Sequence, residues 1–242
     1  YVDTHELAFG GDGQIIFVNS RFSCLATIDE VHSFRPIWRP PFITSLAPED
    51  RCHLNGVAMD DGAPRFVTVA GVSDEKDGWR AHRQGGGAVI DVASGEVVVR
   101  DLTMPHSPRV HDGALWLLDS GRGQIVRVDI ASGKKQDVAF CPGFLRGLAF
   151  HGDYAIVTVS MAREGKFKDL AIQSGLEDRK EEAQCGVLVV DLRTGRTVHS
   201  ILLGSPFTEM FDVAVLPGVR NPMTVGPATV EMIGAVSIAD VI

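Results

Sequence analysis

The chain has 242 residues, of which 45% are hydrophobic and 7% aromatic, and its formal net charge is −8 at pH 7. This composition is that of an ordinary globular domain, long enough to bury a sizeable core. Because the basic residues are scattered and no apolar stretch could span a bilayer, we expect neither nucleic acid nor a membrane as a partner.

A short phrase recurs five times along the chain, beside or within a short apolar strand. The copies are HELAF from His5, NGVAM from Asn55, HSPRV from His106, RGLAF from Arg146 and FDVAV from Phe211. The fourth position is alanine in four copies and Arg109 in the third. Repeats of about 40 to 50 residues built from strands are typical of propeller blades. The sequence therefore predicts an all-β fold, a β-propeller, rather than a β-sandwich, which does not repeat one inner strand.

Further strands follow each phrase. We expect second strands at 14–20, 65–71, 114–120 and 154–160, each followed by an apolar third strand. Third strands end in a hairpin turn of the type Asp-x-x-Ser/Thr-Gly, which begins at Asp91, Asp129 and Asp191. Only the stretch from about 168 to 183 is compatible with a helix.

The repeat counts four complete blades and part of a fifth, which begins at Phe207. A closed propeller needs its last blade completed, so we expect a six-bladed ring in the full-length protein and missing residues at the N-terminus. Residues 1–222 are predicted to form a single propeller domain. The apolar tail 223–242 shares no phrase with the blades, and its structure is left open.

The four cysteines lie far apart and include no C-x-x-C pair; they are Cys24, Cys52, Cys141 and Cys185. This usage suits buried thiols in a reducing compartment, so we expect a cytoplasmic protein.

Long runs of the chain also resemble a known family. They include RFSCLATIDEVHSFRPIWRPPFI, APEDRCHLNGVAM, LTMPHSPRVHDGALWLLDSGRG and PGFLRGLAF. The resemblance covers nearly all of residues 3–222 and is to a bacterial family of conserved hypothetical proteins of unknown function. It implies a propeller-like cytoplasmic protein with a somewhat longer N-terminus, and it implies no established activity.

The first strand of each propeller blade lines the central channel. If the phrases are in register, one ring around the axis contains His5, Asn55, His106, Arg146 and Phe211. A second ring, two residues earlier, contains Asp3, His53, Met104, Phe144 and Glu209. Polar side chains inside a channel are costly unless they are satisfied, so this concentration points to a function.

A metal is one explanation. Neutral imidazoles with carboxylates suit a divalent transition metal such as Zn, Fe, Mn or Ni. We predict His5, His53 and His106 as ligands, with Asp3, Glu6 or Glu209 as further candidates. The alternative is a hydrated channel whose histidines bond to water and to neighbouring carbonyls.

Blades two and four have longer connections between their second and third strands than the other two. These loops emerge where the first strands begin, so they should overhang the predicted histidines. They offer positive charge and a stacking surface to a small anionic ligand, through Trp79, Arg80, His82 and Arg83 in the first loop and Arg163, Lys166 and Lys168 in the second. Ordinary solvated loops are the alternative.

Two functions from different classes follow. The first is a metal-dependent enzyme acting on a small anionic substrate, in which Asn55 and Arg146 orient the substrate, His106 holds the metal, and Glu209 or Asp3 transfers protons. The second is a non-catalytic recognition or scaffold propeller that binds a peptide or protein. The run His53-Leu-Asn-Gly56 faintly resembles the Asn-Gly step of gluconolactonase-like propellers, but the histidines depart from that pattern, so lactone hydrolysis is not expected.

Overall fold

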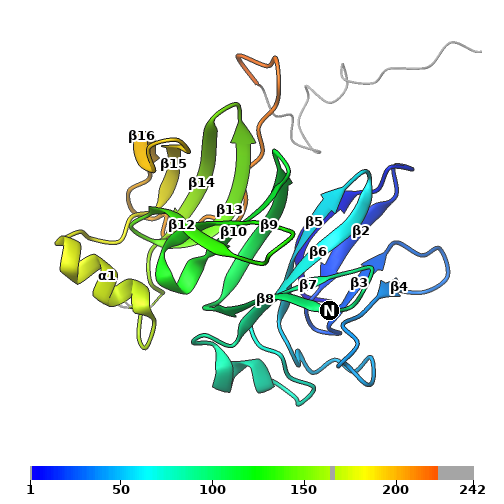
Figure 1. Ribbon diagram of the computed structural model, residues 1–242. Helices are drawn as coiled ribbons and strands as arrows, with labels where there is room; N and C mark the ends of the chain where they lie inside the picture. The colour runs from blue at the N-terminus through cyan, green and yellow to red at the C-terminus, as the bar shows by residue number, and fades with distance from the viewer. Residues whose placement is uncertain (1, 164–166, 223–242) are drawn as a thin grey trace, which may run out of the picture.

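The computed structural model describes residues 2–163 and 167–222. These residues form four antiparallel sheets of four strands each, and within each sheet the strands follow one another in chain order. We number the sheets as blades 1 to 4 (Figure 1). The inner strands are neighbours in the order β1, β5, β9 and β13. This is the all-β propeller architecture that the repeated phrase predicts.

The elements have the following bounds. Blade 1 consists of β1 (Thr4–Phe9), β2 (Ile15–Asn19), β3 (Cys24–Thr27) and β4 (Arg35–Trp38). Blade 2 consists of β5 (Leu54–Asp60), β6 (Ala63–Val69), the 3-10 helix η1 (Gly78–His82), β7 (Gly87–Asp91) and β8 (Val97–Leu102). Blade 3 consists of β9 (Pro105–His111), β10 (Ala114–Asp119), η2 (Ser120–Arg122), β11 (Gln124–Val128) and β12 (Lys135–Phe140). Blade 4 consists of β13 (Phe144–His151), β14 (Tyr154–Ser160), α1 (Ala171–Arg179), β15 (Gly186–Asp191) and β16 (Arg196–Leu202).

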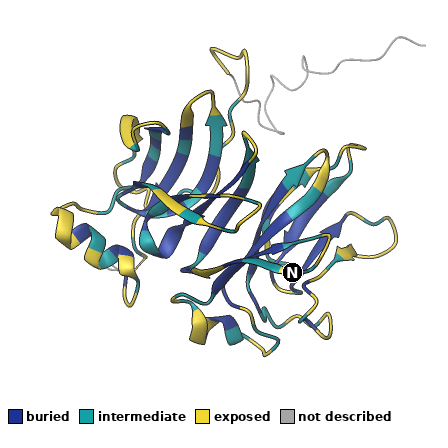
Figure 2. Ribbon diagram, viewed as in Figure 1, coloured by how far each residue is buried: buried dark blue, intermediate teal, exposed yellow. Residues whose placement is uncertain are grey.

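The core lies between the blades because alternate residues of a strand face opposite neighbours. In β6, Val67 and Val69 pack with Val18 of blade 1. The preceding residue, Phe66, packs with Leu115 and Leu117 of blade 3. Figure 2 shows buried residues along the inner strands, whereas the outermost strand β16 is exposed throughout. Both faces of the second strand β6 are therefore apolar, which explains why its end reads as a nearly continuous hydrophobic run.

The predicted register of the phrases is confirmed by strand pairing. Leu7, Val57 and Leu148 each occupy the third position of a phrase, and they pair with Phe17, Val67 and Val157 at the same level of β2, β6 and β14. The pairing of all four inner strands shifts near the start of the phrase. Bulges of this kind re-aim side chains, so neighbouring residues there no longer simply alternate.

The predicted hairpin turns and the predicted helix are also confirmed. Gly95, Gly133 and Gly195 have φ values of 73°, 68° and 68°, which a side chain would strain. α1 falls inside the stretch expected to be helical and is the one α-helix among the residues described. No helix in this part of the chain is long and apolar enough to cross a membrane.

The fifth phrase has no assigned strand in residues 203–222, yet it lies beside blade 4. The Ser160 hydroxyl donates to the Met210 carbonyl at 3.0 Å. Ser20 makes the same contact from blade 1 to the Leu54 carbonyl of blade 2. Because Leu54 directly precedes the second phrase and Met210 directly precedes the fifth, this equivalence puts Phe211 at the level of the other phrases. The tail 223–242 lies outside the described residues.

A buried network of polar groups joins the inner strands. Glu6 of blade 1 accepts a hydrogen bond from the backbone N–H of Val57 at 2.8 Å and forms an ion pair with Arg109 of blade 3. The guanidinium of Arg109 also donates to the Leu148 carbonyl of blade 4 at 3.1 Å. Burial raises the pKa of Glu6, while the charge of Arg109 and the hydrogen bond from Val57 act in the opposite direction.

This network generates a stability prediction. Replacing Arg109 by Met leaves the Glu6 carboxylate buried without its partner, so we expect a loss of about 3–5 kcal/mol in the free energy of unfolding, measured with urea. Arg127→Met is the matched control, because Arg127 is exposed and makes no ion pair within the described residues. Adding Glu6→Gln to Arg109→Met should restore part of the loss. Equal losses in Arg109→Met and Arg127→Met would contradict this role.

Candidate functional site

The starts of the inner strands and the ends of the second strands meet at one end of the propeller. Thr4 pairs with Asn19 in blade 1, and Pro105 pairs with Asp119 in blade 3. His5 and His106 directly follow those two inner residues. We call the group of His5, His53, His106 and Arg146 the mouth. The loops after β6 and β14 leave from this same end, so the predicted placement of the loops and the histidines is confirmed.

His106 is buried, and its ring orientation is fixed by the backbone. Its Nδ1 lies 2.9 Å from the Met104 carbonyl and 3.1 Å from the Ser120 hydroxyl. A carbonyl only accepts, so Nδ1 carries the hydrogen, and in the neutral ring Nε2 keeps a free electron pair. Phe144 packs edge-on against the imidazole, with ring centroids 5.6 Å apart.

His5 has the same tautomer for a similar reason. Its Nδ1 lies 2.7 Å from the Ser20 hydroxyl. The single hydroxyl hydrogen of Ser20 goes to the Leu54 carbonyl, so Ser20 accepts from His5. Asp3 is the carboxylate beside this ring, at 3.9 Å from Nδ1.

His53 is held by a carboxylate and an indole. Its Nδ1 lies 3.0 Å from Asp50 Oδ2. Trp79 donates its Nε1–H to the same Oδ2 at 2.9 Å and stacks on the His53 ring at a centroid distance of 4.3 Å. The edge of His5 meets the His53 ring at 4.6 Å. All three histidines therefore give Nδ1–H to the protein and leave Nε2 available.

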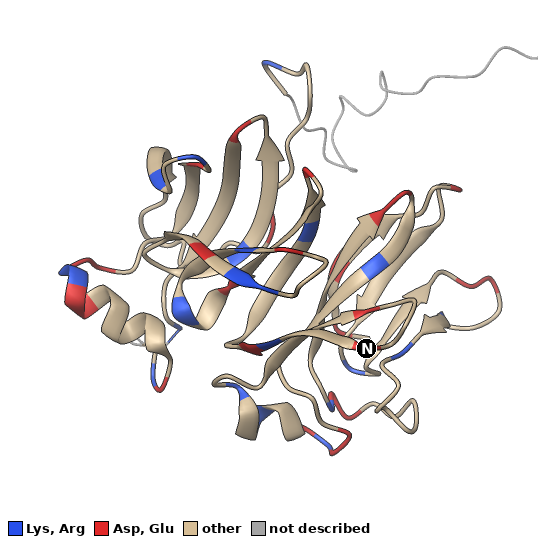
Figure 3. Cartoon of the chain, in the orientation of Figure 1, with Lys and Arg blue, Asp and Glu red and all other residues tan. Residues whose placement is uncertain are grey.

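Burial favours the neutral form of two imidazoles of the mouth, His5 and His106. Burial, and then the charge of Arg146, hold the pKa of His106 well below its usual value. Burial, and then the neighbouring His53, lower the pKa of His5. Figure 3 shows Lys and Arg interspersed with Asp and Glu along the loops and strand ends.

Arg146 is the central cation of the mouth. Its guanidinium lies 4.9 Å from the ring centroid of Phe211, and no carboxylate of the described chain forms an ion pair with it. Burial, and then the charge of Arg163, lower its pKa, but arginine stays protonated at neutral pH. The acid that interacts electrostatically with Arg146 is Glu209. Its two carboxylate oxygens accept hydrogen bonds from Arg163 at 2.5 and 3.2 Å.

Asn55 occupies the same strand position as His5 and His106. It is 3% exposed, and its Oδ1 accepts from the Thr68 hydroxyl at 2.7 Å. Its Nδ2 is buried and has no hydrogen-bond partner among the described residues. An unsatisfied buried donor is costly, so this amide is expected to meet a ligand or a water molecule.

The loop residues predicted to bind a ligand are placed differently from one another. Trp79 is 6% exposed and its ring stacks on His53, so it offers no open surface on which a ligand could stack. Arg80 lies over Trp79 at 4.5 Å, and His82 is exposed beside a separate small cavity near Arg100. Lys166 lies outside the described residues. The two loops are joined to each other, because Arg83 forms an ion pair with Asp169 at 3.1 Å.

The predicted proton carriers are also bound to partners. Arg163 lowers the pKa of Glu209, which favours its ionised form and makes it a poor proton donor at neutral pH. Glu6, a candidate metal ligand, points away from the mouth into the network with Arg109. No group of three or more His, Cys, Asp or Glu within residues 2–163 and 167–222 is arranged to hold a metal ion.

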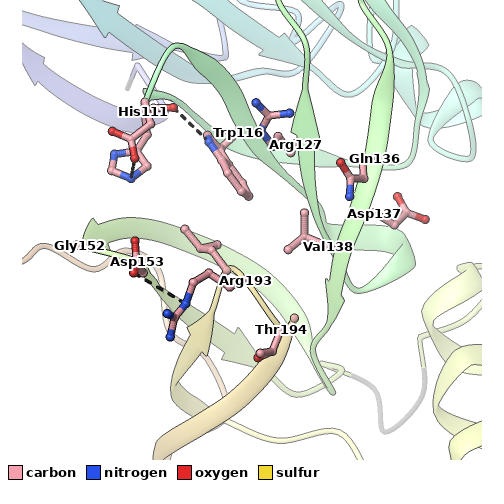
Figure 4. A pocket seen from close by; sticks show the side chains of 13 residues that line it. His111, Trp116, Arg127, Gln136, Asp137, Val138, Gly152, Asp153, Arg193 and Thr194 are labelled. Carbon is pink, nitrogen blue, oxygen red and sulfur yellow. Dashed lines mark hydrogen bonds and ion pairs between the residues drawn. The ribbon is translucent and has the colours of Figure 1, made fainter.

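A cavity of about 590 Å³ lies at the opposite end of the propeller, between blades 3 and 4. Figure 4 shows His111 and Trp116 on one side and Asp153, Arg193 and Thr194 on the other. Its charged lining residues are mostly exposed, and its arginines and aspartates are of mixed sign. We take the mouth as the candidate site instead, because its polar groups are buried and only partly satisfied.

Three residues that build the mouth are not among the sequence candidates: Asp50, Ser20 and Ser120. The two serines directly follow the second strands, in the runs FVNS and LLDS, so the repeat itself indicates their equivalence. Asp50 lies in an irregular connection before β5 and has no counterpart in the other blades. Only the folded loop brings it to His53 and Trp79.

The lowered pKa of His106 predicts a pH effect. The unfolded histidine titrates near pH 6.5. Because the folded pKa is lower, the native state contributes stability that is fully present above about pH 6.5 and is lost as the pH falls. We therefore expect urea unfolding at pH 5.5 to show a larger loss, relative to pH 7.5, in the wild type than in His106→Asn. The exposed His199→Asn should behave as the wild type. Equal losses in all three proteins would contradict the prediction.

Several solved structures share this fold at low identity. Hydrazine synthase of Kuenenia stuttgartiensis matches 84% of this chain and 49% of its own, with 11% identity and a TM-score of 0.50. A protein of unknown function from Bacteroides caccae matches 82% and 60%, with 13% identity and a TM-score of 0.49. Virginiamycin B lyase from Staphylococcus aureus matches 85% and 57%, with 11% identity and a TM-score of 0.47. The chain thus spans between about half and three-fifths of these structures, and the likeness concerns the fold alone.

Curated proteins give no sequence match to this chain. The family model described as a domain of unknown function, DUF4915, matches residues 1–225. This agrees with the resemblance to a family of conserved hypothetical proteins that the sequence runs carry. The chain belongs to the DUF4915 family.

Proposed function

We propose that the mouth binds a small carboxylate-bearing ligand, with its negative charge against Arg146. The observation that carries the proposal is the partly buried guanidinium of Arg146, which has no carboxylate partner in the described chain. A desolvated cation is costly unless an anion pairs with it. Glu209 does not fill this role, because Arg163 binds both of its oxygens.

The other groups of the mouth suit the remainder of such a ligand. The Nε2 atoms of His5, His53 and His106 make no hydrogen bond within the described residues, so each can accept one from a hydroxyl or amine. The Nδ2 of Asn55 is a free donor at the same strand position. A small acid with one or more hydroxyl groups would therefore satisfy the cation, the acceptors and the donor together.

The proposal predicts selective binding of acids. We expect isothermal titration calorimetry to detect succinate, malate or citrate but not the neutral succinamide. Arg146→Gln should weaken binding of the acid by about tenfold or more, since a hydrogen bond to a charged group contributes about 1.5–3 kcal/mol. Arg127→Gln, at the other end of the propeller, is the control. Binding of none of these acids, or unchanged affinity in Arg146→Gln, would contradict the proposal.

A bound divalent transition metal is a second candidate, favoured by the orientation of the histidines. Metal-binding histidines usually donate their other ring N–H to a carboxylate, a carbonyl or a similar acceptor. His53, His106 and His5 do so to Asp50, Met104 and Ser20. A metal held by their Nε2 atoms requires these rings to move together, because they do not form a metal-binding group as described.

Elemental analysis of the purified protein tests the metal. If His5, His53 and His106 hold it, His53→Ala and His106→Ala should each abolish a near-stoichiometric transition metal, because three protein ligands are the usual minimum for such a site. The exposed His199→Ala is expected to keep the metal. Absence of metal from the wild type even after incubation with zinc would contradict this candidate and leave the anion-binding proposal unaffected.

We also propose a reducing compartment, the cytoplasm. The four cysteines are free and buried. Burial raises the pKa of Cys24, Cys52 and Cys141 to about 12, which keeps these thiols protonated and unreactive. Such cysteines act as small core residues and need no oxidising environment.

A further inference from the structure

Among the three imidazoles of the mouth, only His53 donates its Nδ1–H to a carboxylate. The two oxygens of Asp50 lie 3.0 and 3.2 Å from this nitrogen. His106 donates to a carbonyl, and the Asp3 carboxylate lies farther from Nδ1 of His5, at 3.9 Å. A carboxylate hydrogen-bonded to Nδ1 fixes the orientation of the ring and lies where it can stabilise the positive charge that forms when Nε2 accepts a proton.

The charge of Asp50 is available to His53. Its other hydrogen-bond donor is the neutral indole of Trp79, and it forms no ion pair with Lys or Arg in the described part of the chain. Trp79 also lies flat on the imidazole, with an interplanar angle of 24°, and an aromatic face attracts a cation. The groups with the opposite effect are His5, at the ring edge, and Arg80, over Trp79.

The backbone holds this pair in place. Asp50 and His53 have φ values of 45° and 49°, in the left-handed region that non-glycine residues adopt at a cost. The N–H of Asp50 is fixed by the Arg21 carbonyl at 3.0 Å, and the N–H of Trp79 by the Arg51 carbonyl at 3.2 Å. Such strain persists where surrounding contacts determine the conformation, as they do here.

We propose that His53 and Asp50 form the proton-accepting pair of the mouth, acting on a small hydroxy acid held by Arg146. The inference rests on the proposed anion binding and deepens it. In the step, the O–H bond of the ligand breaks, its electron pair stays on the oxygen, and an N–H bond forms at Nε2 of His53. Asp50 neutralises the resulting imidazolium. His53 contacts the ligand and is the catalytic residue, while Asp50 is a positioning residue.

Acylation by diethyl pyrocarbonate tests the pair, because the free electron pair of a neutral imidazole attacks this reagent. The rates are compared at about pH 8.5, well above the usual histidine pKa of about 6.5, so that they report the nucleophilicity of the neutral ring. Mass spectrometry of peptides gives a separate rate for each histidine. Asp50→Asn keeps a hydrogen-bond acceptor for Trp79 and removes the charge, so we expect the rate at His53 to fall by about threefold or more. Asp50→Glu should retain the rate. The matched control is Asp112→Asn, which removes a carboxylate that lies 3.4 Å from His111 at the opposite end of the propeller. It should leave the rate at His53 unchanged.

Protection by ligands tests the role of the hydroxyl. Malate should slow acylation of His53 more than succinate does, because only malate has a hydroxyl group to donate to Nε2, and Asp50→Asn should reduce that difference. Equal protection by the two acids, or an unchanged His53 rate in Asp50→Asn, would overturn the inference.

The failure of the inference and that of the proposed function are distinguishable. If calorimetry shows binding that depends on Arg146 while Asp50→Asn leaves the His53 rate unchanged, anion binding stands and the proton-accepting pair is wrong. If none of the acids binds, both fall together. If Asp50→Asn does not fold, Trp79→Phe serves as the second variant: it removes only the competing N–H donor, so the His53 rate should be kept or rise, and a fall would count against the pair.

Discussion

The contact between Glu6 and Arg109 is the constraint on which the arrangement of the inner strands depends. The two residues come from blades 1 and 3, and the groups that complete their hydrogen bonds come from blades 2 and 4. Charges at such a position are shielded from water, so each must be paired. Apolar packing between blades tolerates small sliding movements, whereas an ion pair with directed hydrogen bonds fixes the strands at one height.

This constraint reaches the mouth directly. His5 is next to Glu6 in β1, and the Ser107 hydroxyl donates to the carbonyl of Arg146 at 2.5 Å, next to the network in β9 and β13. The bulges at the starts of these strands change the direction of successive side chains. In β1, for example, Glu6 binds Arg109 in the interior while the neighbouring His5 lies in the mouth. The same strand segment therefore stabilises the fold and positions the polar groups.

The two long loops build the outer part of the mouth by packing on it. Trp79 from the first loop supports His53, and Phe167 from the second lies 6.4 Å from Phe144, which in turn contacts His106. The loops are linked by Arg83 and Asp169. Rigid support of this kind keeps the imidazoles in one orientation before a ligand arrives, which lowers the entropy cost of binding. The aromatic residues of the two loops thus hold the histidines in place, directly or through Phe144, rather than forming a flexible charged surface.

The blades and their register could be predicted from the amino-acid sequence, because apolar periodicity and turn chemistry are local properties that recur in each repeat. It also indicated that His5, Asn55, His106 and Arg146 share one level of the inner strands. The partners of these side chains, in contrast, follow from the packing of the blades and could not be predicted. Arg109 stands where the other four copies of the phrase have alanine, and its ion pair with Glu6 explains this difference. Asp50 and Trp79 lie on irregular segments, whose course cannot be predicted from hydrophobic periodicity. Side-chain contacts between distant segments depend on how whole blades pack, and that information is not contained in the spacing of any one repeat.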